Sequence, residues 1–196
     1  MYMYGGKHLA QGQTTALVAI GANLPSALGT PEQTVRAAIE KLEAQFDGFA
    51  ASRLYQCPAF PAGAGPDFVN AAVRFETRLQ ADAVLAALHD IEAALGRVRG
   101  VRWASRVIDL DLLALGDLVE PNLATQDAWR GLSLDQQMVE APDQLILPHP
   151  RMQDRGFVLK PLADVASDWV HPLLDRSVAQ MLSELPREDT ADVVPF

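Results

Sequence analysis

Two aspartates alternate with leucines in the apolar segment VIDLDLLAL, residues 107–115. Side chains two positions apart on a strand point to the same face, so Asp109 and Asp111 would project together, about 6.6 Å apart along the backbone. Leu110 and Leu112 would then face the core. Two carboxylates on a rigid strand can share hard cations, and magnesium prefers one or two carboxylates together with phosphate oxygens. The same alternation also describes a half-exposed strand whose aspartates are merely solvated.

Four arginines precede this strand within ten residues that contain no acidic residue: Arg97, Arg99, Arg102 and Arg106. The whole chain, in contrast, carries a formal net charge of −9. Arginine presents a planar fork of donors that grips phosphate, so four of them could clamp a triphosphate and balance charge during phosphoryl transfer. A solvated basic loop that pairs with the acidic surface is the alternative. Beside the two aspartates, the cluster favours a magnesium-dependent phosphoryl-transfer site.

The composition limits the class of protein. A chain of 196 residues, 49% of them hydrophobic, can form one globular domain with a substantial core. The acidic balance argues against a nucleic-acid partner. Residues 1–13, an N-terminal extension, lack the pattern of a secretory signal, no apolar run is long enough to span a membrane, and the single cysteine cannot build a disulfide framework. We therefore expect a cytoplasmic protein without a membrane partner. We also expect the protein to be a monomer.

The hydrophobic pattern predicts the elements that must position these groups. In chain order, we expect a strand at residues 15–21, a helix at 31–46, strands at 49–56 and 68–75, a helix at 80–95 and a strand at 107–115. A turn follows the first strand at residues 21–23, and Gly96 ends the second helix. This order is typical of a ferredoxin-like plait. We expect an α+β fold in which an antiparallel sheet is flanked by helices, as a three-layer α/β/α sandwich.

The second half of the chain is assigned more coarsely, as part of the same single domain. Residues 117–144 have mixed polarity and are predicted to be an insertion with one helical stretch near 126–138. Closing helices are predicted at residues 157–166 and 178–185. The last residues, 186–196, are expected to be frayed.

Four blocks of the sequence carry a family resemblance. They are LVAIGANL, FVNAAVRFET, GRVRGVRWASRVIDLDLLALG and LPHPRMQDRGFVLKPL. The chain resembles the 6-hydroxymethyl-7,8-dihydropterin pyrophosphokinases of folate biosynthesis from about residue 17 to residue 171, and four blocks in the same order make the resemblance specific. It implies that ATP and 6-hydroxymethyl-7,8-dihydropterin are the substrates. It also implies that two Mg²⁺ ions bind with ATP, and that pyrophosphate passes to the pterin hydroxymethyl group with release of AMP.

The resemblance further implies roles for individual residues. Asp109 and Asp111 would hold the metal ions and, with Arg97 and Arg106, make up the catalytic group. The implied nucleotide contacts are His89, Glu92, Arg99, Arg102, Trp103, Ile108, His149 and Arg155. The implied pterin contacts are Cys57, Pro58, Phe60, Phe68, Asn70 and Phe157.

Residue chemistry supports part of this assignment and leaves alternatives for the rest. The amide of Asn70 has donors and an acceptor that suit the pyrimidinone edge of a pterin, and two aromatic rings can hold a flat heterocycle. Phe68 and Phe157 could equally be core residues, His149 a turn residue bonded to backbone, and Trp103 only an anchor of its loop. Two other classes of protein remain as alternatives. A module that binds nucleotide or pterin without turnover would lack one of the four catalytic groups, and a metal-dependent nucleotide hydrolase would need a base or further carboxylates to activate water.

Overall fold

The computed structural model describes residues 12–59, 65–97, 107–133, 136, 140 and 142–196. The elements in chain order are β1 (Thr14–Ala22), α1 (Pro31–Gln45), β2 (Asp47–Ala51), β3 (Tyr55–Cys57), β4 (Phe68–Thr77), α2 (Ala81–Ala94), β5 (Asp109–Leu115), α3 (Leu123–Arg130), the 3₁₀ helix η1 (Met152–Asp154), α5 (Gly156–Ala166), β6 (Val170–His171), β7 (Arg176–Ser177), α6 (Val178–Glu184), α7 (Glu188–Ala191) and β8 (Val194–Pro195). Within these ranges, no helix is long and apolar enough to cross a membrane.

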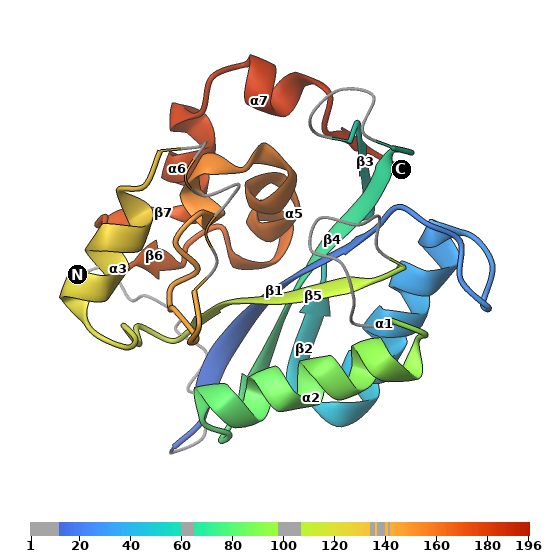
Figure 1. Cartoon of the computed structure of the whole chain (residues 1–196), viewed down its shortest axis with the longest axis horizontal. Helices are drawn as coiled ribbons and strands as arrows, with labels where there is room; N and C mark the ends of the chain where they lie inside the picture. Colours follow the sequence, from blue (N-terminus) through green and yellow to red (C-terminus); the bar gives the residue numbers. More distant parts are fainter. Residues whose placement is uncertain (1–11, 60–64, 98–106, 134–135, 137–139, 141) are drawn as a thin grey trace, which may run out of the picture.

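A six-stranded antiparallel sheet forms the centre of the fold (Figure 1). Its strands are ordered β5-β1-β4-β3-β8, and β2 also pairs with β4. β1 therefore lies between two strands that come much later in the chain, and α1 and α2 provide the crossovers. This topology confirms the predicted ferredoxin-like plait of the α+β class.

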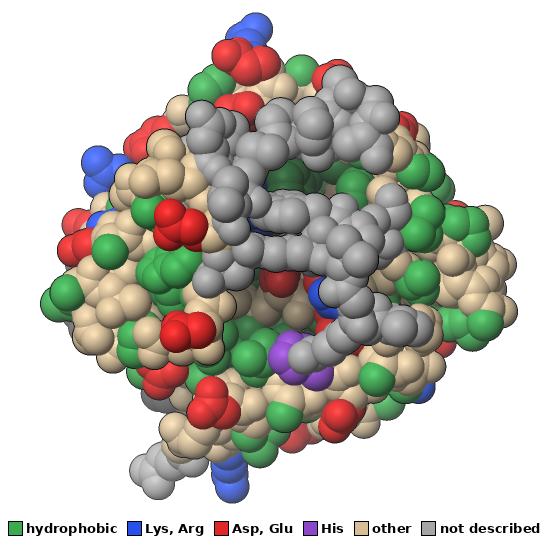
Figure 2. Space-filling model, in the orientation of Figure 1, with side chains coloured by type: hydrophobic (Ala, Val, Ile, Leu, Met, Phe, Trp, Pro, Cys, Tyr) green, Lys and Arg blue, Asp and Glu red, His purple; other side chains and the backbone are tan. Residues whose placement is uncertain are grey.

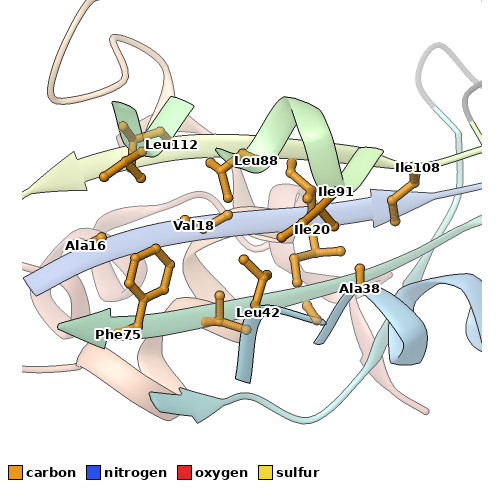
Figure 3. Close-up of a cluster of buried hydrophobic side chains, with 14 of the residues drawn as sticks. Ala16, Val18, Ile20, Ala38, Leu42, Phe75, Leu88, Ile91, Ile108 and Leu112 are labelled. Atoms are coloured by element: carbon orange, nitrogen blue, oxygen red, sulfur yellow. The ribbon is translucent and has the colours of Figure 1, made fainter. Parts of the chain in front are cut away.

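Alternation along the strands divides the apolar side chains between the two faces of the sheet. Val18 and Ile20 of β1 join the core cluster under α1 and α2, which Figure 3 shows. Leu17, which points the other way, packs with Leu159 of α5 and Met181 of α6. Helices on both faces give the three layers that the sequence predicted.

β5 presents its leucines and its aspartates to opposite faces, as expected. Leu110 and Leu112 are 2% and 3% exposed and lie in the core cluster beneath α2. Asp109 and Asp111 consequently face the side of the sheet that α5 covers. The side chain of Asp109 is only 18% exposed, so it is not a solvated surface group.

The strand predicted at residues 49–56 is two strands, β2 and β3, which both pair with β4. Between them the Ser52 hydroxyl accepts a hydrogen bond from Ala72 N (2.9 Å), while Ser52 N donates to Ala72 O (2.9 Å). The next residue, Arg53, leaves the ladder and pairs with Asp164 of α5 (2.8 Å). The prediction of one continuous strand was wrong because a side-chain hydroxyl replaces a backbone carbonyl at this point.

Residues 117–144 contain helix α3, which begins earlier than the helix expected at 126–138. Residues 134–135 and 137–139 of that expected helix lie outside the described residues. Asn122 caps α3 by accepting a hydrogen bond from Thr125 N (3.0 Å). Gly131 follows the last helical residue. Asparagine is a strong N-cap, and the earlier start follows from this cap rather than from apolar periodicity.

The C-terminal segment, residues 186–196, was expected to be frayed, and the structure corrects this. It forms α7 and then β8, which adds an edge strand to β3 with Pro195 opposite Tyr55. Val193 between them is only 5% exposed. The prediction was wrong because the partner strand lies far away in the sequence, where local polarity gives no sign of it.

Candidate active site

The register of the sheet places Asp109 and Asn70 on one row. Gly21 of β1 pairs with Asp109 of β5 on one side and with Asn70 of β4 on the other. Directly opposed residues of neighbouring strands point to the same face. The two side chains therefore project from one face about 10 Å apart, which is two strand spacings. β1 continues through Gly21 to Ala22, so the turn expected at residues 21–23 begins later.

Because Gly21 has no side chain, the surface of the sheet between these two side chains is unobstructed. A Cβ on Gly21 would lie 3.1 Å from Oδ1 of Asn70 and 3.9 Å from a ring carbon of Phe68. In the row beyond it, the small Ala19 lies opposite Asp111. A ligand can thus cross β1 close to the backbone. Gly21 was not among the predicted site residues, because its position between two strands depends on a register that the sequence does not reveal.

Arg97 connects α2 to β5 through two carboxylates. Its guanidinium donates to Oε1 of Glu92 and to Oδ1 of Asp109. Glu92 is 2% exposed, and its Oε1 also accepts a hydrogen bond from Leu110 N (2.8 Å). Burial raises the pKa of Glu92 to about 7, and the bond from Leu110 and the charge of Arg97 oppose this rise. Three of the predicted site residues, Arg97, Glu92 and Asp109, are therefore in direct contact.

His149 and Arg155 bring further nitrogen donors toward the two aspartates. Nδ1 of His149 accepts a hydrogen bond from Arg151 N (3.1 Å). Burial, followed by the positive charge of Arg155, lowers the pKa of His149 to about 3. The imidazole is therefore neutral near pH 7, with its proton assigned to Nε2, from which it can donate to a phosphate oxygen. Burial also lowers the pKa of Arg155, and the negative charges of Asp111 and Asp109 oppose that change.

Helix α3 holds the PHP motif, Pro148 to Pro150, beside β5. Gln126 is fully buried and donates from Nε2 to the carbonyl oxygen of Pro148 (2.8 Å). The next residue, His149, donates its backbone N–H to Leu113 O of β5 (2.7 Å). Gln126 thus positions a predicted nucleotide contact, and it was missed because nothing local distinguishes it from other polar residues of its segment.

Asn70, Cys57 and Phe68 form a contiguous group at the other end of the row. Asn70 is 5% exposed and donates from Nδ2 to Sγ of Cys57 (3.0 Å). Cys57 belongs to an apolar cluster with Tyr55 and Val193, and Phe68 packs against this cluster, half-buried. Burial raises the pKa of the Cys57 thiol to about 11, so it is a neutral thiol. This group can offer an amide and an aromatic face to one flat ligand.

The remaining residues predicted to contact a substrate differ in how deeply they are buried. Ile108 is fully buried in the core beneath α2 (Figure 3), so only its backbone is left for a nucleotide. Phe157 is 38% exposed at the start of α5, with the Arg155 guanidinium 5.8 Å from its ring centroid, which excludes a role in the core. His89 is half-buried on α2, and Pro58 is exposed after β3. Five predicted site residues lie outside the described residues: Phe60, Arg99, Arg102, Trp103 and Arg106.

The donor set at this site fits magnesium better than a metal that needs a full protein cage. In the part of the chain that the structure describes, no group of three or more His, Cys, Asp or Glu side chains could hold a metal ion. Asp109 and Asp111 offer two carboxylates on one face, and magnesium completes such a set with water and phosphate oxygens. The space-filling view shows acidic, basic and histidine side chains gathered over the middle of the molecule (Figure 2).

Comparison with known proteins identifies relatives of this chain. Residues 17–167 match the family described as 7,8-dihydro-6-hydroxymethylpterin-pyrophosphokinase, abbreviated HPPK. The chain belongs to the HPPK family. It is 34% identical over 173 residues to the 2-amino-4-hydroxy-6-hydroxymethyldihydropteridine pyrophosphokinase of Pseudomonas aeruginosa, covering 87% of this chain and 91% of that protein. Its identity to the Synechocystis protein of the same name is 31% over 170 residues, covering 87% and 75% of the two chains.

Some relatives in the HPPK family are much longer. The chain is 31% identical over 179 residues to the folic acid synthesis protein fol1 of Pneumocystis carinii, which covers 91% of this chain but 22% of that protein. The crystal structure of wild-type Plasmodium falciparum HPPK-DHPS with pteroate has the same fold, with a TM-score of 0.59 at 13% identity. That likeness covers 88% of this chain and 42% of the other. The HPPK match ends at residue 167, so α6, α7 and β8 lie beyond it.

Proposed function

We propose that this chain transfers pyrophosphate from ATP to the hydroxymethyl group of 6-hydroxymethyl-7,8-dihydropterin, giving AMP and the pterin diphosphate, with magnesium bound together with ATP. The observation that carries the proposal is the row of Asp109, Gly21 and Asn70. The row puts the carboxylate of Asp109 and the buried amide of Asn70 on one face of the sheet, about 10 Å apart, with only a glycine between them. Membership of the HPPK family supports the same substrates.

The amide of Asn70 and the rings of Phe68 and Phe157 would hold the pterin. The Asn70 Nδ2–H donates to Cys57, which fixes the plane of the amide and directs its second N–H and its Oδ1 to a ligand edge. Phe68 lies beside this amide over Gly21, and Phe157 offers an exposed ring from α5. A flat heterocycle gains from stacking on such rings.

The phosphate half of the site depends on charge and alignment. Asp109 and Asp111 would hold Mg²⁺, which supplies positive charge to the triphosphate when bound. Arg97 is held in place by Glu92 and Asp109, so its guanidinium is oriented before ATP arrives. The pterin hydroxymethyl oxygen attacks the β-phosphorus and AMP leaves, a displacement that needs positioning rather than a protein nucleophile.

One assay separates this function from the two alternatives. The protein is mixed with Mg²⁺ and ATP, with and without hydroxymethyl-dihydropterin, and nucleotide products are resolved by chromatography. AMP that forms only with pterin supports the pyrophosphokinase. AMP or ADP formed without pterin indicates a nucleotide hydrolase, and no product at all indicates a binding module. Omitting Mg²⁺ tests the metal requirement in the same experiment.

Asp111→Asn tests the metal role with minimal change in shape. We expect kcat to fall roughly 100-fold or more, since electrostatic groups of active sites have effects of this order. The melting temperature should change little, because the apolar neighbour Leu112 carries the packing. Asp117→Asn, at an exposed position just beyond β5, is the matched control and should retain full activity. Normal turnover by folded Asp111→Asn protein contradicts the metal role.

We propose that a monomer is the active unit. Light scattering at assay concentration measures the mass directly, and activity confined to a dimeric fraction would refute this part of the proposal.

A further inference from the structure

The C-terminal segment, residues 186–196, contacts two elements that each carry part of the proposed pterin site. β3 ends at Cys57, and α5 begins immediately before Phe157. In Figure 1, α7 lies over α5 and the chain then ends beside β3. The HPPK match ends at residue 167, before this segment begins.

Val193 of this segment packs against residues of the proposed pterin site. It shares an apolar cluster with Tyr55 and Cys57, and Phe68 packs against the same cluster. Cys57 in turn accepts the hydrogen bond from the amide of Asn70 (3.0 Å). Val193 therefore helps to determine where Cys57 and Phe68 lie and, through Cys57, how the amide of Asn70 is oriented.

Backbone hydrogen bonds hold β8 on the edge of β3. Tyr55 pairs with Pro195, and the N–H of Phe196 donates to the carbonyl oxygen of Leu54 (2.8 Å). The other edge of β3 pairs with β4. A strand of three residues is weakly held by one neighbour, so the second neighbour restricts its movement.

Lys160 and Gly156 attach the segment to α5. The ammonium of Lys160 donates to the carbonyl oxygens of Thr190 (2.7 Å) and Val193 (2.8 Å), and its charge strengthens both bonds. A Cβ on Gly156 would lie 2.0 Å from the carbonyl oxygen of Asp189, so the backbone of α7 rests directly on the first residue of α5. Lys160 and Gly156 are one helical turn apart, and they define the face of α5 that the segment covers.

We propose that residues 186–196 are a positioning element that fixes β3 relative to the first turn of α5 and thereby sets the width of the pterin pocket, with Lys160 as its positioning residue. This inference rests on the proposed function, since it concerns the pterin half of that site. The contacts described above run to β3 and α5, which carry Cys57 and Phe157, whereas Asp109 and Asp111 lie on β5. Among the described nucleotide contacts, only Arg155 adjoins α5. Loosening the segment therefore affects the pterin more than ATP.

Lys160→Met in the full chain tests the proposal, because it removes the ammonium and keeps the length of the side chain. The KM for pterin is measured at saturating ATP, the KM for ATP at saturating pterin, and the melting temperature is recorded. We expect the KM for pterin to rise roughly tenfold, and kcat and the KM for ATP to change less than about twofold. Lys160→Arg, which can still donate to two carbonyls, should restore most of the affinity for pterin. Val193→Ala should show the same selective loss.

Lys41→Met is the matched control, because Lys41 is exposed on α1 at the opposite face of the sheet. It should match the wild type in every measurement. A lower melting temperature with both KM values unchanged, or an equal rise in both, overturns the inference, because the segment then acts only on overall stability. Absence of pterin-dependent AMP from the wild type is a different result, which overturns the proposed function itself.

Discussion

Glu92 is a buried carboxyl group whose two oxygens have different surroundings. Oε1 accepts hydrogen bonds from Leu110 N and Arg97, whereas Oε2 is buried and has no hydrogen-bond partner. The pKa is raised from 4.5 to about 7, chiefly by burial. Between pH 4.5 and about pH 7, Glu92 is therefore mostly protonated in the native state and mostly ionised in the unfolded state. Across this window, the contribution of Glu92 to the free energy of unfolding decreases as pH rises.

Glu92→Gln should remove this pH dependence, because glutamine keeps an acceptor for Leu110 but cannot ionise. The wild type loses at most roughly 3 kcal/mol from this group as pH rises through the window, and the variant loses none. Urea unfolding at about pH 5 and pH 8 measures both proteins without nucleotide. The unfolding free energy of the variant, relative to that of the wild type, should be higher at about pH 8 than at about pH 5. A constant difference would show that Glu92 does not titrate in this range.

Cys57 should be chemically inert in the folded protein. Its pKa is raised to about 11 by burial, and only the thiolate reacts with disulfide reagents or alkylating agents. Since the chain has a single cysteine, the absorbance from DTNB reports this residue alone. We expect a reaction at neutral pH that is slower than that of the urea-unfolded chain by about a hundredfold or more. Equal rates in both states would contradict the buried position of the thiol.

At the scale of elements, α3 acts on the site through one hydrogen bond. Gln126→Leu removes the donor to Pro148 O and leaves that buried carbonyl unpaired, which costs about 1–3 kcal/mol of stability. Because His149 follows directly, we also expect the KM for ATP to rise several-fold. Gln45→Leu, at an exposed position of α1, is the control and should leave the KM for ATP unchanged. A wild-type KM for ATP in folded Gln126→Leu protein would mean that α3 does not position His149.

The elements that the sequence predicted well are those determined by local periodicity. The alternation of Leu110 and Leu112 with the aspartates already fixes which side of β5 is buried, and the structure agrees. The break between β2 and β3 was not predictable, because it depends on Ser52 bonding to Ala72 and on a later helix. The pairing of β8 with β3 is equally non-local, as it joins Tyr55 to Pro195, which are far apart in the sequence.

The same distinction applies to the candidate site. Asp109, Asp111 and Asn70 could be selected because their residue types and motifs carry chemical information. Gly21 could not be selected as a site residue, because it matters only through its position between Asp109 and Asn70 in the register of three strands. The role of Gln126 depends on a contact with a carbonyl oxygen much later in the chain. Tertiary pairing supplies this information, and no local pattern contains it.

At the scale of the whole molecule, the buried groups Glu92 and His171 and the half-buried His149 make stability depend on pH in opposite directions. Burial lowers the pKa of His149 to about 3 and of His171 to about 4, both from 6.5, and raises that of Glu92 to about 7. Below pH 6.5 the unfolded state binds protons that the native histidines do not, so their stabilising contribution is lost as pH falls through 6.5 toward the folded values. The two histidines and Glu92 therefore change the free energy of unfolding with pH in opposite directions.

His171→Asn tests this balance at a position away from the candidate site. His171 is fully buried, its Nδ1 accepts a hydrogen bond from Leu173 N (3.2 Å), and its ring meets Trp169 edge-on, with centroids 5.7 Å apart. Asparagine can keep the acceptor but cannot take up a proton, and it loses the ring contact. The variant should therefore be less stable than the wild type near pH 7.5, and the difference in unfolding free energy should narrow by up to roughly 3 kcal/mol as pH falls toward 4.

Urea unfolding at a series of pH values between 7.5 and 4 measures this difference in unfolding free energy. Glu92→Gln should deviate from the wild type in the opposite direction over the same range. Parallel curves for His171→Asn and wild type would show that His171 is not the buried neutral group on which this balance depends.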